Sequence, residues 1–337
     1  MKTKSLLQNF LFLPIILTSF LHAQEIKWGG YGNVGYVFYN RNVLNKFNQE
    51  AYYEGKLKSE IKFGKKIEGQ FDIKGNSVDN SIRIQDMNIK FEIAKYFNLK
   101  VGNEKKPFGY EYLTGEEDLL TINRSYVQEN LAELGYGGRA VGIIGYYKYS
   151  PKRPEFPYTY YISVFKDNSL FTSIVTRFSY HINELSFGVN YMIQSKGGEQ
   201  KITTHAFGGS MFLENENYTG MIELFLAQDP FESNRRELMG NDDKVISFGG
   251  KILASYNFKM EEEFLIGIEP LLLLSYFSPD TDIPGSHVIQ IIGGSNFYIH
   301  KNIRARLNAD IRLTKNQFIT DYGLEESRVI LALQMTF

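Results

Sequence analysis

The sequence predicts an all-β protein that folds as a transmembrane antiparallel β-barrel of about sixteen strands. Three observations predict this fold. Apolar and polar residues alternate along many segments, short and long connections alternate between these segments, and residues 24–337 contain no run of about 18 apolar residues. Such a chain crosses a bilayer by strands, because a barrel wall separates lipid from water and no segment is apolar enough to cross as a helix.

The N-terminal stretch has the composition of a secretory signal peptide. Two lysines precede an apolar run that ends at Leu21, and the small residue Ala23 follows. We therefore expect residues 1–23 to be removed on export and residues 24–337 to form one outer-membrane barrel domain.

Charge and composition exclude several classes of protein. Of the 37 Lys and Arg residues, two lie in the signal stretch, so 35 remain against 38 Asp and Glu, a formal charge of −3. This balance gives no reason to expect a nucleic-acid partner. The chain has no cysteine, which excludes disulfides, thiolate metal sites and a cysteine nucleophile. Its 23 tyrosines, 26 phenylalanines and 30 glycines suit many strands joined by turns.

The two-residue alternation is clearest in three segments. In residues 53–63 one parity is mostly apolar, whereas the other carries only lysine and glutamate. Residues 67–74 repeat the pattern after the connection 64–66, as expected for a hairpin. Residues 303–313 alternate Ile, Ala and Leu with Arg, Asn and Asp. A soluble β-sandwich is the alternative, but the length of the chain and the repetition of the pattern favour a barrel.

The same reasoning divides the whole chain into strands and connections. The predicted strands lie near 28–40, 51–63, 67–75, 82–93, 98–103, 139–149, 158–165, 172–180, 185–194, 203–213, 218–227, 245–258, 263–274, 287–298, 302–313 and 327–337. Connections after even-numbered strands are mostly short, at 64–66, 94–97, 181–184, 214–217, 259–262 and 299–301, with a longer one at 150–157. Connections after odd-numbered strands include the long ones, at 104–138, 228–244, 275–286 and 314–326. Short turns on one rim and long loops on the other are typical of outer-membrane barrels.

Some strands are irregular in sequence. The first and tenth are weakly patterned. In the fourth, apolar residues change parity between Ile84 and Met87, so we expect a β-bulge near Gln85 and Asp86. The last strand ends on an aromatic residue, which resembles the terminal recognition strand of outer-membrane proteins.

A motif in the longest connection resembles a known family. Residues 102–114 read GNEKKPFGYEYLT, and residues 123–125 read NRS. This resembles the phosphate-selective porin O and P family, whose pattern is G-Q-x-K-x-P-F-G-x-E-x-L-T followed by E-R-S. The matching residues are Gly102, Lys105, Pro107, Phe108, Gly109, Glu111, Leu113, Thr114, Arg124 and Ser125. Asn103 and Asn123 stand where the family has Gln and Glu.

The resemblance implies a function as well as a fold. It implies an outer-membrane porin of sixteen strands, often a homotrimer, whose third long loop folds inward and narrows the pore. It also implies that the solutes are small hydrophilic molecules and that anions, phosphate among them, are preferred. Such a channel lies among outer-membrane lipids, and its mechanism is the width and field of the pore.

Basic residues are the candidates for setting that field. The pore or constriction candidates are Lys105, Lys106, Arg124, Arg83, Arg177, Arg304, Arg306 and Arg312. Other basic residues on the predicted lumen faces are Lys56, Lys58, Lys62, Lys74 and Arg328. Arg304, Arg306 and Arg312 share one parity of one strand, so a ladder of charges along the pore is one interpretation.

The lumen faces also carry acids, which leaves a second interpretation open. These acids are Glu54, Glu60, Glu68, Asp72, Glu92, Glu223, Glu269 and Asp310. A mixed pore with internal ion pairs is therefore at least as well supported as an anion-selective one. For Arg124, a loop anchor paired with a wall carboxylate competes with a solute-facing charge at the constriction and is favoured. Pro107, Phe108 and Gly109 are expected to set the turn that sends the loop inward, since Pro fixes φ and Gly permits positive φ.

Other functions are less well supported. The four histidines after the signal stretch show no metal-ligand spacing, so we expect no metal and no cofactor. No local motif indicates the paired nucleophile and base of a barrel hydrolase. A surface-displayed adhesin or antigen remains the alternative to a channel. A transporter of hydrophobic solutes would have an apolar pocket or an N-terminal plug, and we expect too few residues before the first predicted strand for a plug.

Overall fold

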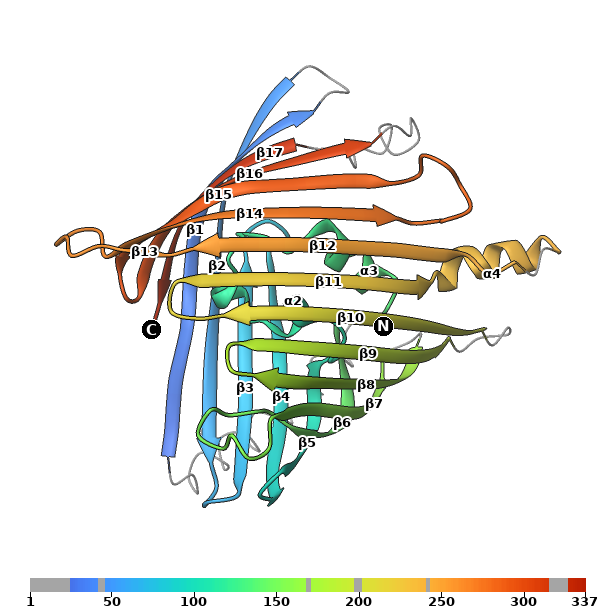
Figure 1. Ribbon diagram of the computed structural model, residues 1–337, viewed down its shortest axis with the longest axis horizontal. Coiled ribbons are helices and arrows are strands. Elements are labelled where there is room, and N and C mark those ends of the chain that lie inside the picture. Colours follow the sequence, from blue (N-terminus) through green and yellow to red (C-terminus); the bar gives the residue numbers. More distant parts are fainter. Residues whose placement is uncertain (1–24, 42–45, 168–170, 197–201, 241–242, 315–326) are drawn as a thin grey trace, which may run out of the picture.

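The wall of the protein is one antiparallel sheet closed into a barrel (Figure 1). This computed structural model describes residues 25–41, 46–167, 171–196, 202–240, 243–314 and 327–337. The predicted signal peptide lies outside the described residues. The barrel closes where β1 (Glu25–Arg41) pairs with β17 (Ser327–Thr336), in a register that runs from Tyr31 opposite Thr336 to Asn40 opposite Ser327.

The strands follow one another around the wall in chain order, each paired with its sequence neighbour. Between β1 and β17 they are β2 (Lys46–Lys62), β3 (Ile67–Asn76), β4 (Ser81–Ala94), β5 (Phe97–Lys105), β6 (Arg139–Tyr147), β7 (Tyr158–Lys166), β8 (Phe171–Ile182), β9 (Leu185–Lys196), β10 (Ile202–Glu214), β11 (Tyr218–Gln228), β12 (Ile246–Tyr256), β13 (Phe258–Lys259), β14 (Gly267–Ser278), β15 (Val288–His300) and β16 (Ile303–Thr314). The two-residue β13 continues β12 after one interrupted position, and both pair with β14. The wall therefore has sixteen strands, which confirms the predicted count.

The predicted bulge in β4 is confirmed. Phe71 of β3 faces Met87 and Ile73 faces Ile84, so Gln85 and Asp86 together stand opposite one residue of β3. The extra residue restores the apolar face of β4 to the outside, which explains the change of parity in the sequence.

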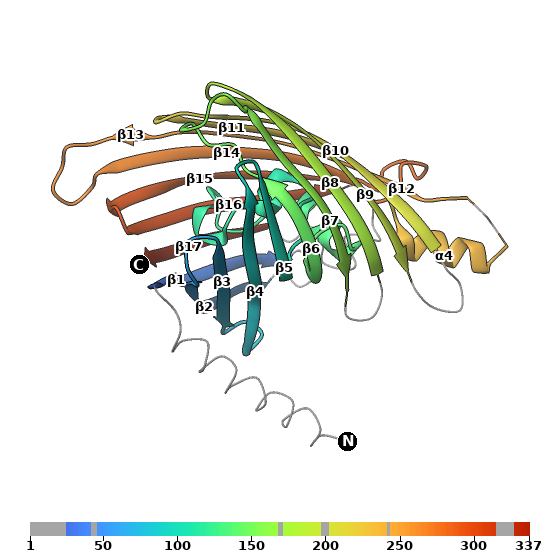
Figure 2. The ribbon, with the colours of Figure 1, turned by 90° about the horizontal axis from the view of Figure 1, so that it is seen from below.

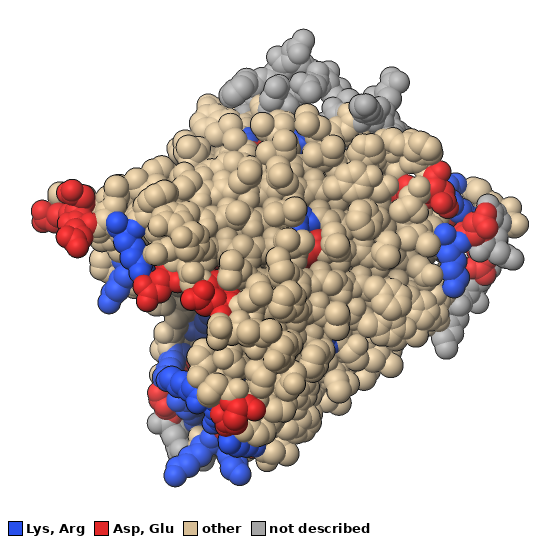
Figure 3. Space-filling model, in the orientation of Figure 1, with Lys and Arg blue, Asp and Glu red and all other residues tan. Residues whose placement is uncertain are grey.

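The two faces of the wall have opposite character. On β2 the outward Tyr53 and Leu57 are 67% and 44% exposed, whereas the inward Lys56 is 7% exposed. Charged side chains gather near the edges of the face shown in Figure 3, and the middle of that face is almost free of them. Apolar residues outside and polar residues inside are what a strand between lipid and a wet lumen requires.

In the connections that the structure describes, four segments are helical. They are α2 (Tyr110–Leu113), η1 (Glu116–Asp118), α3 (Tyr126–Glu133) and α4 (Pro230–Leu238). No helix among the described residues is both long and apolar enough to span a membrane.

The connection from β5 to β6, residues 106–138, is the inner loop. It carries α2, η1 and α3 and lies inside the ring of strands, as Figure 2 shows. Phe108 is fully buried, with its ring centroid 5.7 Å from that of Phe225 on β11 and 6.0 Å from that of Tyr136. The main hydrophobic core thus lies between the inner loop and the wall, and it holds the loop in the lumen.

One glycine permits the inward turn. Gly109 has φ +84° and ψ 148°, a conformation that essentially only glycine adopts. A Cβ at this position would lie 3.0 Å from Oε1 of Gln128. Glycine therefore also avoids a close contact with Gln128 in this turn. The sequence-based expectation for this turn agrees with the structure.

Candidate pore and constriction

A buried ionic cluster fastens the inner loop to β11 and β12. Lys251 pairs with Glu111 and, at 3.0 Å, with Glu223, and all three side chains are at most 3% exposed. Glu223 also accepts hydrogen bonds from the backbone N–H groups of Tyr110 and Glu111, and Glu111 accepts one of 2.6 Å from the Ser125 hydroxyl. Burial by itself would raise the pKa of Glu111, but the adjacent Lys251 lowers it below its usual range. Glu111 therefore stays ionised and holds α2 against the wall.

A second anchor lies on β16. Arg304 and Arg306 donate to the carbonyl of Leu119 at 3.1 and 2.7 Å. Asn308 accepts a 2.7 Å hydrogen bond from the backbone N–H of Ile122. Both arginines are buried, so this part of the predicted ladder binds the loop backbone.

The tip of the inner loop is acidic and partly neutralised by the wall. Glu116 accepts hydrogen bonds of 2.6 Å from both Lys74 and Tyr31, and Glu117 pairs with Lys58. Burial opposes ionisation of Glu116, but Lys74 lowers its pKa to about 2. Two predicted lumen residues, Lys58 and Lys74, therefore bind the loop tip together with Tyr31, which the sequence did not indicate.

Paired charges line the wall opposite the loop. Lys56 lies 2.9 Å from Asp72 and 3.7 Å from Asp86, and Asp86 also accepts a 2.7 Å hydrogen bond from Arg139. The bulge in β4 places Asp86 within reach of both cations. Internal ion pairs were one interpretation of the sequence, which named Lys56 and Asp72 among the lumen charges but not Asp86 or Arg139.

Two cations of the family-like motif converge on the loop. Lys105 and Arg124 each donate to the carbonyl of Thr114 at 2.9 Å, and both lie over the ring of Tyr112. Neither forms a salt bridge with a carboxylate in the described part of the chain. The six residues of these two groups are four cations and two carboxylates, but Glu104, Glu117 and Asp118 also line the cavity beside Lys105.

The remaining candidates lie apart from these clusters. Lys106 is 1% exposed and donates to the carbonyl of Gly135 at 2.9 Å, and burial lowers its pKa. Arg83 is largely exposed beside the β3–β4 turn, where it pairs with Asp79.

Arg312 belongs to a further network around the inner loop. It lies 3.4 Å from Glu129 of α3 and 3.6 Å from Asp310, which also binds Arg328 at 2.9 Å. Burial raises the pKa of Glu129, against the effect of Arg312. Arg177, on β8, is 5% exposed, and its guanidinium lies 5.6 Å from the ring centre of Tyr110. The structure thus does not bring the eight candidates together at one point.

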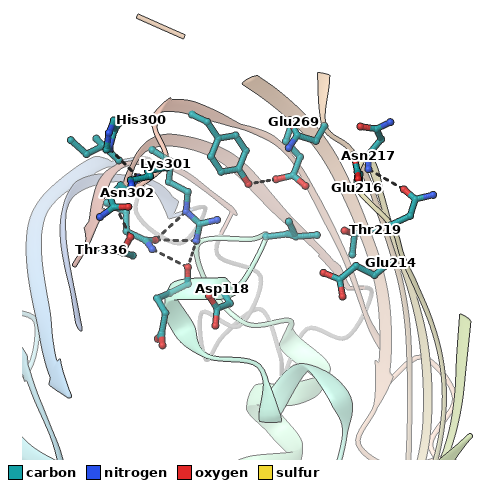
Figure 4. Close-up of a pocket in the computed structure, with 18 residues that line it drawn as sticks. Asp118, Glu214, Glu216, Asn217, Thr219, Glu269, His300, Lys301, Asn302 and Thr336 are labelled. Carbon is teal, nitrogen blue, oxygen red and sulfur yellow. Dashed lines mark hydrogen bonds between the residues drawn. The ribbon is translucent and has the colours of Figure 1, made fainter. Parts of the chain in front are cut away.

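Cavities of opposite charge flank the loop tip on the side of the short turns. One, of about 490 Å³, is the acidic cavity, and Figure 4 shows its lining residues around Asp118. Its charged lining residues are Glu117, Asp118, Glu214, Glu216, Glu269, Lys301 and Arg304. The other, of about 450 Å³, is the basic cavity, whose charged lining residues are Glu68, Glu92, Lys90, Lys95, Lys100, Lys148, Lys152 and Arg153.

A smaller cavity connects these two. The connecting cavity, of about 260 Å³, shares Lys100 and Lys148 with the basic cavity and Glu117 and Asp118 with the acidic one. Lys105 also lines it. The loop tip therefore stands between two differently charged parts of the lumen.

Sequence reasoning missed two residues that matter here. Lys251 was not among the candidates, although a lone lysine at a lumen parity of the otherwise apolar β12 was a detectable signal. Asp118 was also missed. It is exposed and forms no ion pair among the described residues. Only the placement of the loop shows that Asp118 lines both the acidic cavity and the connecting cavity.

Comparison with known proteins agrees with this geometry. The family model described as phosphate-selective porin O and P matches residues 52–219, which include the motif and the inner loop. The chain belongs to this family. It is an outer-membrane porin, a passive diffusion channel of the bacterial outer membrane. Family and fold are those of a channel rather than of an enzyme.

Solved porins share the fold at low sequence identity. An anion-selective porin from Comamonas acidovorans is 11% identical, with a TM-score of 0.64 over 93% of this chain and 99% of its own. The outer-membrane channel DcaP of Acinetobacter baumannii is 10% identical, with a TM-score of 0.64 over 93% and 97%. OmpF of Salmonella typhi, in a complex with daunomycin, is 11% identical, with a TM-score of 0.66 over 94% and 99%. No curated protein matches the chain.

Proposed function

We propose that this porin passes small anions more readily than cations and that phosphate is among its solutes. The observation that carries the proposal is Arg124, a cation that lies beside Lys105 at the inner loop and has no carboxylate partner among the described residues. Fixed charge at a narrow, poorly screened place raises the local concentration of the opposite ion.

The basic cavity supports the same preference. Within the described chain, Lys148, Lys152 and Arg153 of its lining form no salt bridge. In the acidic cavity, Asp118, Glu214 and Glu269 also have no salt-bridge partner in the described part of the chain. Lys301 and Arg304, which line the same cavity, offset part of their negative charge. The preference is therefore expected to be weak, since cations retain a path along the acidic side.

The test is the reversal potential of the refolded protein in planar bilayers under a KCl gradient. An anion-selective potential, and block of the chloride current by added phosphate, are the expected results. The double substitution Lys148→Gln and Lys152→Gln should move the potential toward zero, whereas the matched double change Lys65→Gln and Lys66→Gln, on the exposed turn between β2 and β3 away from these cavities, should leave it unchanged. A cation-selective potential in the unaltered protein would contradict the proposal, and an absence of conductance would favour a surface-displayed barrel.

We also propose a homotrimer. The solved structure titled as the trimer form of OmpT of Vibrio cholerae has a TM-score of 0.61 to this chain at 7% identity, which supports the same fold. Light scattering of the detergent-solubilised protein measures the assembly directly. A mass of one chain under conditions that preserve conductance would contradict this proposal.

A further inference from the structure

An apolar row crosses the lumen face of five strands. In the registers of the paired strands each member stands opposite the next, and the row consists of Phe212 on β10, Met221 on β11, Leu253 on β12, Leu273 on β14 and Ile292 on β15. A porin wall normally carries polar residues on this face, because the face meets water. The apolar row therefore departs from the pattern of the wall and needs a cause of its own.

The inner loop accounts for one end of the row. Leu273 and Ile292 are at most 2% exposed, and Leu120 of the loop packs against the cluster that contains them. At the other end Phe212 stays partly exposed, although its ring stacks on that of Tyr110 with 4.1 Å between the centroids. Docking of the loop thus explains the apolar residues of β14 and β15 but leaves part of the β10–β12 side uncovered.

A cavity of about 410 Å³, the apolar cavity, lies between the loop and this uncovered side. Its apolar lining residues are Leu113, Leu119, Leu120, Phe212, Met221 and Leu253, and Tyr110 lies beside them. Small-molecule sites typically have volumes of roughly 300–1,000 Å³ and a mostly apolar lining with a few polar groups. The apolar cavity has both properties, and the apolar part of a solute gains free energy by leaving water for such a lining.

Two carboxylates give this cavity its charge. Asp118 of the loop and Glu214 of β10 line both the apolar cavity and the acidic cavity, and Figure 4 shows them at different sides of the acidic one. Neither forms a salt bridge within the described chain. The third lining carboxylate, Glu111, is neutralised by Lys251. Two negative charges are therefore left without compensation.

Cations are missing from the same lining. No lysine or arginine of the described chain lines the apolar cavity. Thr114 lines it, but the side chains that donate to its carbonyl, Lys105 and Arg124, do not. An anion would be repelled by the two carboxylates, and a neutral solute would leave them unpaired. Both the charge and the surface of the cavity thus fit a cation with an apolar body.

We propose that the apolar cavity binds a small organic cation that combines an aromatic or branched aliphatic body with a primary ammonium group. The body lies against Phe212, Met221 and Leu253, and the ammonium group, which only donates, lies near Asp118 and Glu214. Such a solute enters from the acidic cavity, because the two cavities share both carboxylates. The site goes beyond the proposed anion preference, and neither depends on the other.

Block of the KCl current in planar bilayers tests the site, with phenethylamine as the probe. This amine is protonated at neutral pH, and we expect it to reduce the single-channel current in a saturable way, because the bound molecule stands beside the loop tip. Ethylamine keeps the charge without the ring, and phenethyl alcohol keeps the ring without the charge. Each should block about tenfold more weakly, since each makes only one of the two kinds of contact.

Substitutions separate the two kinds of contact. Asp118→Asn combined with Glu214→Gln should weaken block by phenethylamine by about tenfold, to the level of phenethyl alcohol. Met221→Gln, which nearly keeps the size of the side chain, should weaken it through loss of apolar contact. The matched control is Glu216→Gln, which removes a carboxylate that lines the acidic cavity but not the apolar one, and it should leave block nearly unchanged. The heat-dependent gel shift of a folded barrel is required of every variant.

Crystals soaked with ring-brominated phenethylamine give a second readout that needs no conductance. We expect an anomalous bromine peak beside Phe212 and Met221, and no peak in the double variant of Asp118 and Glu214. Equal block by phenethylamine and either of its two analogues would overturn the site, as would crystals without bromine in the apolar cavity. The reversal potential is measured without amine, so failure of the site leaves the proposed anion preference standing, and a cation-selective potential leaves the site standing.

Discussion

Replacing Lys251 by methionine is the most direct test of how the inner loop is held. The lysine is fully buried between Glu111 of the loop and Glu223 of β11, and the methionine is similar in size. The substitution removes the only cation that forms a salt bridge with either carboxylate in the described chain, and it leaves two buried negative charges facing each other.

The magnitude follows from the burial. Breaking a buried ion pair by removal of one partner costs about 3–5 kcal/mol, because the remaining charge stays desolvated and uncompensated. Since about 1.4 kcal/mol is a tenfold change in an equilibrium, the docked state of the loop should weaken by roughly 10²-fold to about 4 × 10³-fold relative to an undocked one. An exposed pair contributes only about 0–1 kcal/mol, so Lys259→Met, which disrupts the exposed pair with Glu216, is the control.

Two assays follow the loop and the wall separately. Single-channel recording should show Lys251→Met with larger and noisier conductance, because the loop spends more time away from the lumen wall. Urea unfolding in lipid vesicles should show a lower free energy of unfolding. Adding Glu111→Gln to Lys251→Met should restore part of both losses, since one unpaired charge is removed. Conductance and stability equal to those of Lys259→Met would refute the reasoning.

Three further predictions concern the same loop. Gly109→Ala should cost about 1–3 kcal/mol, measured by urea unfolding, because its φ of +84° and ψ of 148° suit only glycine. Arg306→Gln should increase current noise in single-channel recordings because it removes a buried donor to the carbonyl of Leu119. Current noise equal to that of the unaltered protein would contradict that role. The pKa of Glu116 falls from 4.5 to about 2 on folding, so its contribution to stability is present above pH 4.5 and is lost as the pH falls through 2. Conductance at pH 5 should therefore match that at pH 7, and Glu116→Gln should remove the change seen at lower pH.

The sequence was sufficient to predict the wall. A strand between lipid and water must alternate with a period of two. The local sequence therefore predicts that Lys56 faces the lumen and Leu57 faces the lipid, without knowledge of the neighbouring strands. The same rule located the bulge at Gln85 and Asp86, because only an extra residue reconciles the two parities of β4. The inward loop was predicted from the resemblance of residues 102–114 to a porin family, and the proline and glycine of that motif indicated only where the chain turns.

Parity alone could not assign roles to the charges. It placed Arg304 and Arg306 inside the barrel, but whether a lumen arginine faces solute or loop depends on where the loop docks. That docking depends on contacts such as Glu111 with Lys251, which lie 140 positions apart in the chain. The period of a strand is a local property written in consecutive residues, whereas the pairing of charges across a lumen depends on closure of the barrel. For this reason the sequence by itself determined the wall and its two faces, and only the tertiary structure decided which cations anchor the loop and which remain in the pore.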